Sequence, residues 1–359
     1  MEKIIPIFLF ILLILSAGCS GKIPTYDRDV WLYSIDPSGE LNWNSCVDCL
    51  SMDIADSLIE SNDGNYIIGG GGVSEKMPNS IIPEIIWISP KGDMLNKRYY
   101  GTKDDGWVTT LSKDSNDCFF MVCHSGKSFL LDQNGEPLHI IDINVTKPGW
   151  WLSSKTPNGY VAASRTEAFS VSDSGDLLWH TVYQQNSSSS GPPSSLIRNE
   201  KGNFVIAYSH SYKNEFNILL TELDDKGNIV GKGALNTGSE FNNIYFTKQI
   251  KNGNYDIIGN GSIISVDIYG KHPSVNQADY IVPNSVFCQS GDCYAEPITG
   301  KKSLFGKENN KIRLVKKKTD GKVSFDMYYN AGNFKDNPVA LIETNNEGYA
   351  VLVRHETYE

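Results

Sequence analysis

The stretch DPSGELNW, residues 36–43, has the composition of a tight turn between two strands. Variants of it recur as DQNGEPLH at 132–139, DSGDLLW at 173–179 and DDKGNIV at 224–230. An Asp side chain accepts hydrogen bonds from backbone N–H groups two residues on, and Gly adopts the positive φ that closes a tight turn. The stretch therefore predicts a β-hairpin that the chain forms repeatedly.

Seven turn glycines mark this first hairpin type along the chain. They are Gly39, Gly92, Gly135, Gly175, Gly227, Gly270 and Gly321. An apolar residue stands four positions before each of them except Gly321, where the residue is Lys317. The mean spacing from the first glycine to the last is 47 residues, which is typical of one four-stranded blade of a β-propeller.

A second hairpin type alternates with the first, and an aromatic residue opens its second strand. These aromatics are Tyr66, Phe119, Tyr160, Phe204, Tyr255, Tyr294 and Tyr349. Short strands joined by Asn-Gly, Asp-Gly and Glu-Gly turns indicate hairpins, and no segment shows a sustained helical period. Seven hairpins of each type predict an all-β fold with seven four-stranded antiparallel blades.

The order of the hairpins predicts how the ring closes. The chain begins with a lone outer hairpin over 30–43 and ends with a lone inner hairpin over 341–354. Paired, they complete the seventh blade and leave no unpaired sheet edge at the junction. We therefore expect one seven-bladed β-propeller over residues 29–359.

The N-terminus carries an export signal. Lys3 precedes an apolar run over 4–15, and Ser16-Ala17-Gly18-Cys19 follows it. Twelve residues of helix span about 18 Å, which is too short for a bilayer core of about 30 Å. The run is therefore typical of a signal peptide, with residues 1–18 removed, rather than of a membrane-spanning helix.

Small residues followed by Cys19 resemble a prokaryotic lipobox. The resemblance implies a lipid on Cys19, a linker over 19–28, and anchoring to the outer face of a prokaryotic membrane. Ser20 resembles the residue that sorts such proteins to an outer membrane, in cells that have one. The alternative is an ordinary secreted protein cleaved near Gly18.

Six further cysteines are disulfide candidates in an exported chain: Cys46, Cys49, Cys118, Cys123, Cys288 and Cys293. Cys288 and Cys293 bracket a tight hairpin and can face each other across it. Cys118 and Cys123 point to opposite faces of a strand, so we do not expect them to pair. Cys46 and Cys49 favour a local disulfide, since neither a thioredoxin-like setting nor a second pair of zinc ligands is visible.

Both short hairpin turns of every blade are expected on one face of the ring, with the long connections on the other. Those connections are 70–84, 184–194, 271–283 and 295–311. A rigid sheet that holds variable loops is a usual host for a binding site. The contact candidates at or beside these loops are Trp107, His124, Trp150, Arg165, His210 and Tyr212. Inter-blade packing for the two tryptophans, and solvent exposure for the histidines, remain the alternatives.

Several function classes find no support in the sequence. A net charge of −10 and a pI near 5.2 argue against a nucleic-acid partner. The histidines show no metal-ligand spacing, and we expect neither a metal nor a cofactor. Gly69–Gly72 lacks the Lys-Ser/Thr of a phosphate loop, so we interpret it as a flexible strand exit.

The D-x-x-G…W hairpins, as in DPSGELNW and DSGDLLW, resemble quinoprotein-like and related β-propeller repeats. A lipobox followed by such a ring is similar to the propeller lipoproteins of bacterial outer-membrane assembly. The resemblance implies a lipid-anchored binding or scaffold module for an envelope or surface protein, or for a glycan. The alternative is a propeller enzyme, either a quinoprotein-like dehydrogenase or a polysaccharide lyase or hydrolase, for which Asp104, Asp105 and Glu167 are loose candidate acids.

Overall fold

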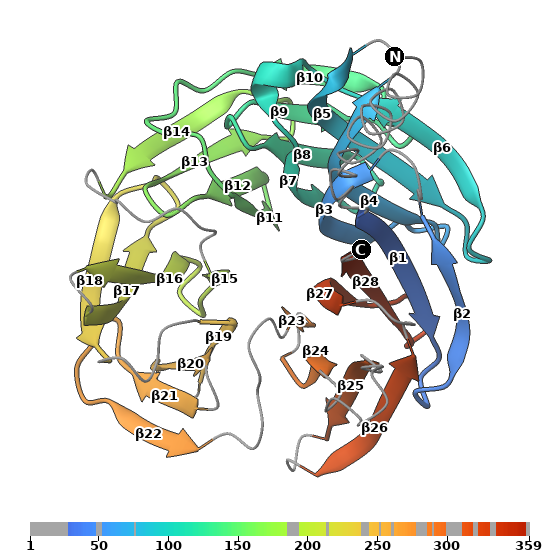
Figure 1. The fold of residues 1–359 in the computed structure, drawn as a ribbon. Coiled ribbons are helices and arrows are strands. Elements are labelled where there is room, and N and C mark those ends of the chain that lie inside the picture. Colours follow the sequence, from blue (N-terminus) through green and yellow to red (C-terminus); the bar gives the residue numbers. More distant parts are fainter. Residues whose placement is uncertain are drawn as a thin grey trace, which may run out of the picture.

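The strands form a ring of seven four-stranded antiparallel sheets (Figure 1). The computed structural model describes residues 28–47, 52–74, 77–184, 194–212, 215–237, 244–250, 253–259, 262–277, 286–288, 291–298, 311–318, 322–330 and 335–356. The ring confirms the predicted all-β, seven-bladed propeller. The predicted signal peptide, Cys19, and the linker up to residue 27 lie outside the described residues. Within the described residues, no helix is long and apolar enough to cross a membrane.

Six sheets each take four consecutive strands, named here from the innermost strand outward. The first sheet contains β3 (Met52–Glu60), β4 (Tyr66–Ser74), β5 (Met77–Ile88) and β6 (Met94–Tyr99). The second contains β7 (Val108–Lys113), β8 (Phe119–Cys123), β9 (Ser128–Leu131) and β10 (Pro137–Ile141), and the 3-10 helix η1 (Lys103–Asp105) precedes it. The third contains β11 (Leu152–Thr156), β12 (Gly159–Ala163), β13 (Glu167–Ser172) and β14 (Leu177–Val182).

The next three sheets repeat the same order. The fourth contains β15 (Ser195–Arg198), β16 (Phe204–Tyr212), β17 (Glu215–Leu223) and β18 (Ile229–Asn236). The fifth contains β19 (Phe246–Gln249), β20 (Tyr255–Gly259), β21 (Ser262–Val266) and β22 (Ser274–Gln277). The sixth contains β23 (Val286–Phe287), β24 (Cys293–Ile298), β25 (Lys311–Lys317) and β26 (Val323–Asn330).

The closing sheet joins the two ends of the chain. Its order is β2 (Leu41–Cys46), β1 (Arg28–Ile35), β28 (Tyr349–Glu356) and β27 (Lys335–Glu343). β1 pairs antiparallel with β28, from Arg28 opposite Glu356 to Ile35 opposite Tyr349. The first and last strands therefore satisfy each other's backbone groups instead of presenting open edges.

The hairpin DPSGELNW forms as its sequence predicts. Asp36 Oδ1 accepts from the N–H of Ser38 at 2.8 Å and of Glu40 at 2.9 Å, and Gly39 has φ +92°. Asp132, Asp224 and Asp267 accept backbone N–H bonds at the same two offsets. The repeated Asp and Gly are therefore turn residues, and they define structure rather than a binding site.

The tryptophan that ends this hairpin packs between blades. Trp43 Nε1 donates to the Pro90 carbonyl in the next sheet at 2.8 Å. A Cβ on Gly92 would lie 2.9 Å from the Trp43 ring, so the next turn glycine also makes room for the indole. Trp179 donates in the same way to the Asp225 carbonyl at 3.0 Å. Both indoles thus fix the spacing of neighbouring blades.

Because each sheet is an antiparallel meander, its two short turns lie on one face of the ring. We call this the short-turn face, with turns such as 61–65 and 89–93, and the opposite side the long-connection face. The predicted long loop over 70–84 is wrong in large part, since β4 continues to Ser74 and β5 begins at Met77.

The strand-exit interpretation of Gly69–Gly72 is also wrong. These glycines lie buried inside β4. A Cβ on Gly70 would lie 1.9 Å from the Ile54 carbonyl oxygen, and one on Gly71 would lie 2.5 Å from the Trp107 Cβ. The run therefore exists because two neighbouring segments approach the β4 backbone too closely for side chains.

The core lies between adjacent blades. The seven aromatics that were predicted to open the second strands are all at most 5% exposed. Two of them, Tyr160 and Tyr294, are the second residue of their strand rather than the first. Cys118, Cys123, Cys288 and Cys293 are not disulfide-bonded in the structure. The pairing of Cys46 with Cys49 stays a prediction, because Cys49 lies outside the described residues.

Candidate functional site

Three of the six predicted contact residues come together on the long-connection face. The Trp107 and His124 rings stack with centroids 4.3 Å apart and planes at 23°. The Trp150 ring stands edge-on to both, 5.6 Å from Trp107 and 5.6 Å from His124. All three side chains are partly exposed. They form an aromatic surface beside the first residues of the innermost strands β7 and β11.

An ion pair supports the aromatic surface. Asp56 Oδ2 accepts from Trp107 Nε1 at 2.7 Å, and Asp56 Oδ1 lies 3.0 Å from Arg354 Nη2. Arg354 Nη2 also donates to the Ala55 carbonyl at 3.2 Å. We call Asp56, Trp107, His124, Trp150 and Arg354 the rim cluster. Arg354 comes from the closing sheet and Asp56 from the first sheet. Trp107 and Trp150 precede β7 and β11, and His124 follows β8 in the second sheet.

Local backbone features position these side chains. Asp56 is a bulge residue: Ala55 pairs with Gly70 and Ser57 with Gly69, so Asp56 has no partner in the ladder. A bulge re-aims the side chain of the extra residue. The absence of a Cβ on Gly71 then lets the Trp107 side chain approach β4.

Backbone hydrogen bonds hold the aromatic segments together. The His124 N–H donates to the Trp107 carbonyl at 2.9 Å, and the Gly149 N–H donates to the His124 carbonyl at 2.8 Å. Gly106, with φ +74°, turns the chain immediately before Trp107. The cluster is therefore held by ordered backbone rather than by side-chain packing alone.

Burial dominates the electrostatics of the cluster. Desolvation raises the pKa of Asp56, although Arg354 and the indole N–H groups of Trp107 and Trp150 favour its charged form. Desolvation also lowers the pKa of His124, and the nearby Asp56 opposes that shift. The surface thus presents two indole rings and an imidazole whose neutral form is favoured by burial, over the largely buried pair of Asp56 and Arg354.

The raised pKa of Asp56 predicts a pH dependence of stability. The folded chain binds this proton more tightly than the unfolded chain, so the contribution of Asp56 to the free energy of unfolding decreases as pH rises above its ordinary pKa of 3.8. We expect wild type to lose stability relative to Asp56→Asn as the pH rises above 3.8. Urea titrations of both proteins at each pH measure this, and parallel pH profiles would contradict it.

The other three predicted contact residues lie farther round the ring. Arg165 is in the β12–β13 connection, where burial lowers its pKa and Tyr208 opposes the shift. His210 and Tyr212 are on β16, and His210 is partly exposed opposite Asn217. The structure therefore divides the six predicted residues into one cluster and a separate region on the third and fourth sheets.

The loose acids named for an enzyme have structural hydrogen bonds. Asp105 closes a capping box with Thr102 at the start of η1. Glu167 is fully buried, where it accepts from the Thr146 N–H at 2.9 Å and lies 2.8 Å from His180 Nε2. These bonds explain both buried carboxylates without a catalytic role. Asp104 is exposed in η1.

Asp56 and Arg354 were not predicted as site residues. The available signal was an acid within the inner strand 52–60 and a base after the apolar run of β28. Nothing in the sequence connects two residues that are 298 positions apart. Only the ring closure, which places β28 beside the first sheet, brings them together.

Comparisons with known proteins support the fold and no more. No protein-family model matches the chain, and no curated protein matches it. The WD40 domain of Neurospora crassa Pan2 is similar, with TM-score 0.50 and 9% identity over 85% of this chain and 90% of that one. The C-terminal WD40 domain of Sif2 gives 0.49 and 11% over 83% and 80%. A protein of unknown function from Bacteroides caccae gives 0.40 and 13% over 69% and 94%.

The chain is thus a seven-bladed β-propeller with four antiparallel strands in each blade. At these identities the likeness extends to architecture alone. The resemblances to quinoprotein-like repeats and to propeller lipoproteins stay predictions.

Proposed function

We propose that this chain is a binding scaffold, lipid-anchored through Cys19 to the outer face of a prokaryotic membrane, that recruits an envelope or surface protein. A propeller fold is consistent with a binding role, since its rigid blades hold a contact surface in place. The observation that carries the proposal is the partly exposed aromatic surface of the rim cluster, set on the Asp56–Arg354 pair.

The composition of the rim cluster suits a protein partner. Trp and Arg are enriched among residues that contribute most to protein binding, particularly where they are ordered in advance. Here the Asp56 carboxylate accepts hydrogen bonds from both Trp107 and Arg354, which fixes the orientation of both side chains. Little side-chain freedom then remains to be lost when a partner covers the rings.

Alanine substitution tests the docking surface. We expect Trp150→Ala and His124→Ala to weaken recovery of a partner crosslinked on intact cells by about tenfold or more, since such anchors contribute about 2 kcal/mol or more. Tyr269→Ala is the matched control, because Tyr269 is 56% exposed and lies on a short turn. Equal recovery of the partner with all three variants would contradict the protein-docking proposal. If the variants instead lose a bound glycan and keep the crosslinked protein, the ligand of this surface is a glycan.

Substitution of Cys19 tests the anchor. We expect Cys19→Ser to abolish incorporation of labelled fatty acid and to release the protein from the membrane fraction. Cys118→Ser removes a partly exposed thiol of the propeller and is expected to leave labelling unchanged. Undiminished labelling of Cys19→Ser would contradict lipidation at this residue.

The oxidation state of Cys288 and Cys293 tests whether the chain resides in an oxidising compartment. Both are fully buried, and the Cys293 N–H lies 3.2 Å from Cys288 Sγ, so the pair faces across its hairpin as predicted. If the chain is exported, we expect the two thiols to be oxidised to a disulfide in protein isolated from its native host. Thiol counting after denaturation, with and without reductant, checks this. Two free thiols here would argue against an oxidising compartment.

A further inference from the structure

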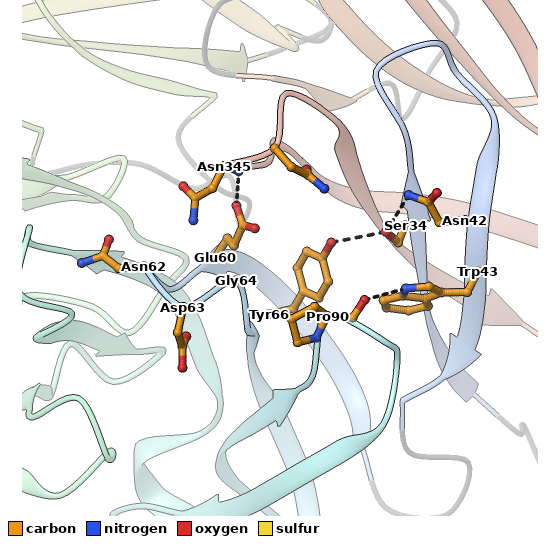
Figure 2. A pocket seen from close by; sticks show the side chains of 11 residues that line it. Ser34, Asn42, Trp43, Glu60, Asn62, Asp63, Gly64, Tyr66, Pro90 and Asn345 are labelled. Atoms are coloured by element: carbon orange, nitrogen blue, oxygen red, sulfur yellow. Dashed lines mark hydrogen bonds between the residues drawn. The ribbon is translucent and has the colours of Figure 1, made fainter.

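A polar pocket of about 440 Å³ lies on the short-turn face, between the closing sheet and the first sheet. Figure 2 shows its lining, which combines the faces of Trp43 and Tyr66 with amide, hydroxyl and carboxylate groups. The lining residues are Ser34, Asn42, Trp43, Glu60, Asn62, Asp63, Gly64, Tyr66, Pro90, Asn345 and Asn346. Among these there is no Lys, Arg or His, so the formal charges of the pocket are the carboxylates of Glu60 and Asp63.

The strand registers define an internal counterpart for this junction. Ser34 pairs with Trp43 in the closing sheet, and Glu60 pairs with Tyr66 in the first sheet. One junction earlier in the ring, Lys316 pairs with Phe325, and Glu343 pairs with Tyr349. The aromatic contacts agree: Trp43–Tyr66 centroids are 5.8 Å apart at 71°, and Phe325–Tyr349 centroids are 5.6 Å apart at 69°.

At the counterpart junction, an ammonium group from the chain lies between the carboxylate and the ring. Lys316 Nζ is 3.0 Å from Glu343 Oε1, 2.8 Å from Asp292 Oδ1 and 5.6 Å from the Tyr349 centroid. The same two carboxylates and Cys288 have metal-ligand spacing, but the Lys316 ammonium already bridges the carboxylates.

A second counterpart supplies its cation differently. In the junction between the third and fourth sheets, Ser170 pairs with Trp179, and Arg198 pairs with Phe204. The Arg198 guanidinium lies 5.9 Å from the Phe204 centroid. Here Ser170 stands at the position that corresponds to Lys316, and Arg198 supplies the cation instead. Arg198 occupies the position that corresponds to Glu60 in the first sheet.

The junction shown in Figure 2 has neither of these two cations: both of the positions that supply a cation elsewhere are occupied here by residues without a positive charge. It has Ser34 where one counterpart has Lys316, and Glu60 where the other has Arg198. We propose that this pocket binds an alkylammonium or guanidinium cation from outside the chain, held between the Glu60 carboxylate and the Tyr66 ring. A cation over an aromatic face gains about 0.5–2 kcal/mol, and an ionised hydrogen-bond partner adds to it.

The pocket groups are ordered before any ligand arrives. Glu60 Oε2 accepts from the Asn345 N–H at 2.6 Å, and the Tyr66 hydroxyl lies 3.3 Å from Ser34 Oγ. Trp43 is fixed by its bond to the Pro90 carbonyl, as Figure 2 shows. The second oxygen of Glu60 remains for a donor, which is the role that Glu343 Oε1 has toward Lys316.

The surrounding charge favours a cation over an anion. Burial raises the pKa of Glu60, and the Asn345 N–H and the nearby Lys113 oppose that shift. The Lys113 ammonium itself is bound to Asn62 Oδ1 at 2.9 Å and to Asp117 Oδ1 at 3.1 Å. A phosphate or carboxylate ligand would meet Glu60 and Asp63 without a compensating base in the lining.

Calorimetric titration of the intact protein at neutral pH tests the site. The probes are n-butylammonium, an acetylated peptide with one lysine, and n-pentanol as the neutral control. We expect saturable binding of a cationic probe and none of pentanol. Equal affinity for the amine and the peptide indicates a free amine as ligand, whereas a peptide at least tenfold tighter indicates a polypeptide side chain. Absence of saturable binding by both cations overturns the proposal.

Two substitutions in the pocket and one control substitution locate the binding. Glu60→Gln keeps the shape of the side chain and is expected to weaken binding by about tenfold or more. Glu343→Gln removes the matched carboxylate of the counterpart junction and is expected to leave the affinity for the probe unchanged. Ser34→Lys copies Lys316, so the introduced ammonium should compete with the probe and abolish its binding while the chain remains folded. Unchanged affinity in both Glu60→Gln and Ser34→Lys would also overturn the proposal.

Discussion

Gly70→Ala is expected to destabilise the protein by about 3 kcal/mol or more, and to prevent folding if the margin is smaller than this. The new Cβ would lie 1.9 Å from the Ile54 carbonyl oxygen and 2.9 Å from its carbon, and both are backbone atoms of the neighbouring strand. Relief would require β3 and β4 to separate beside Asp56. Urea unfolding monitored by circular dichroism gives the change in free energy.

Gly149→Ala is the matched control for this substitution. A Cβ on Gly149 would meet no atom within 4 Å, and this glycine is not among those with positive φ. We expect a change within about 0.5 kcal/mol there. A similar loss of stability in both variants would show that the close approach of β3 and β4 is not the cause.

Arg354→Ala is expected to cost about 2 kcal/mol of stability. Removing one partner of a fully buried pair costs about 3–5 kcal/mol, because the other charge is left without compensation. The Asp56 and Arg354 side chains are 16% and 23% exposed, so solvent reduces that figure. Urea unfolding measures the loss, and the near-ultraviolet circular dichroism of the tryptophans should change with it.

A double-mutant cycle separates the ion pair from the packing of each side chain. We expect Asp56→Asn with Arg354→Leu to be less destabilised than the sum of the single variants. The exposed pair of Lys155 and Asp173, 2.9 Å apart, is the comparison, with an expected coupling below about 1 kcal/mol. Equal coupling energies in the two pairs would mean that the rim cluster has no special electrostatic role.

The fold was predictable because each blade repeats its own local signals. Asp36 and Gly39 specify one turn through hydrogen bonding and positive φ, and the same chemistry recurs with the blade spacing. The run Gly69–Gly72 was not predictable, because its cause is the approach of Ile54 and Trp107. Local sequence cannot report which segments lie against a strand in the folded ring.

The rim cluster was predictable only in part. Trp107, His124 and Trp150 stand out as aromatic residues beside loop positions, and the structure brings them together. Asp56 and Arg354 depend on a bulge and on the pairing of β1 with β28. The Figure 2 pocket was missed entirely, because it follows from a comparison of blade junctions that requires the strand registers.

Site-specific photo-crosslinking on intact cells is the most direct test of the docking surface. A photoreactive phenylalanine analogue replaces His124 in one strain and Tyr269 in another, so each face of the ring carries one probe of similar size. We expect one envelope protein to be captured from position 124, and not from position 269. Capture of the same protein with equal yield from both positions, or from position 269 alone, would contradict docking at the rim cluster.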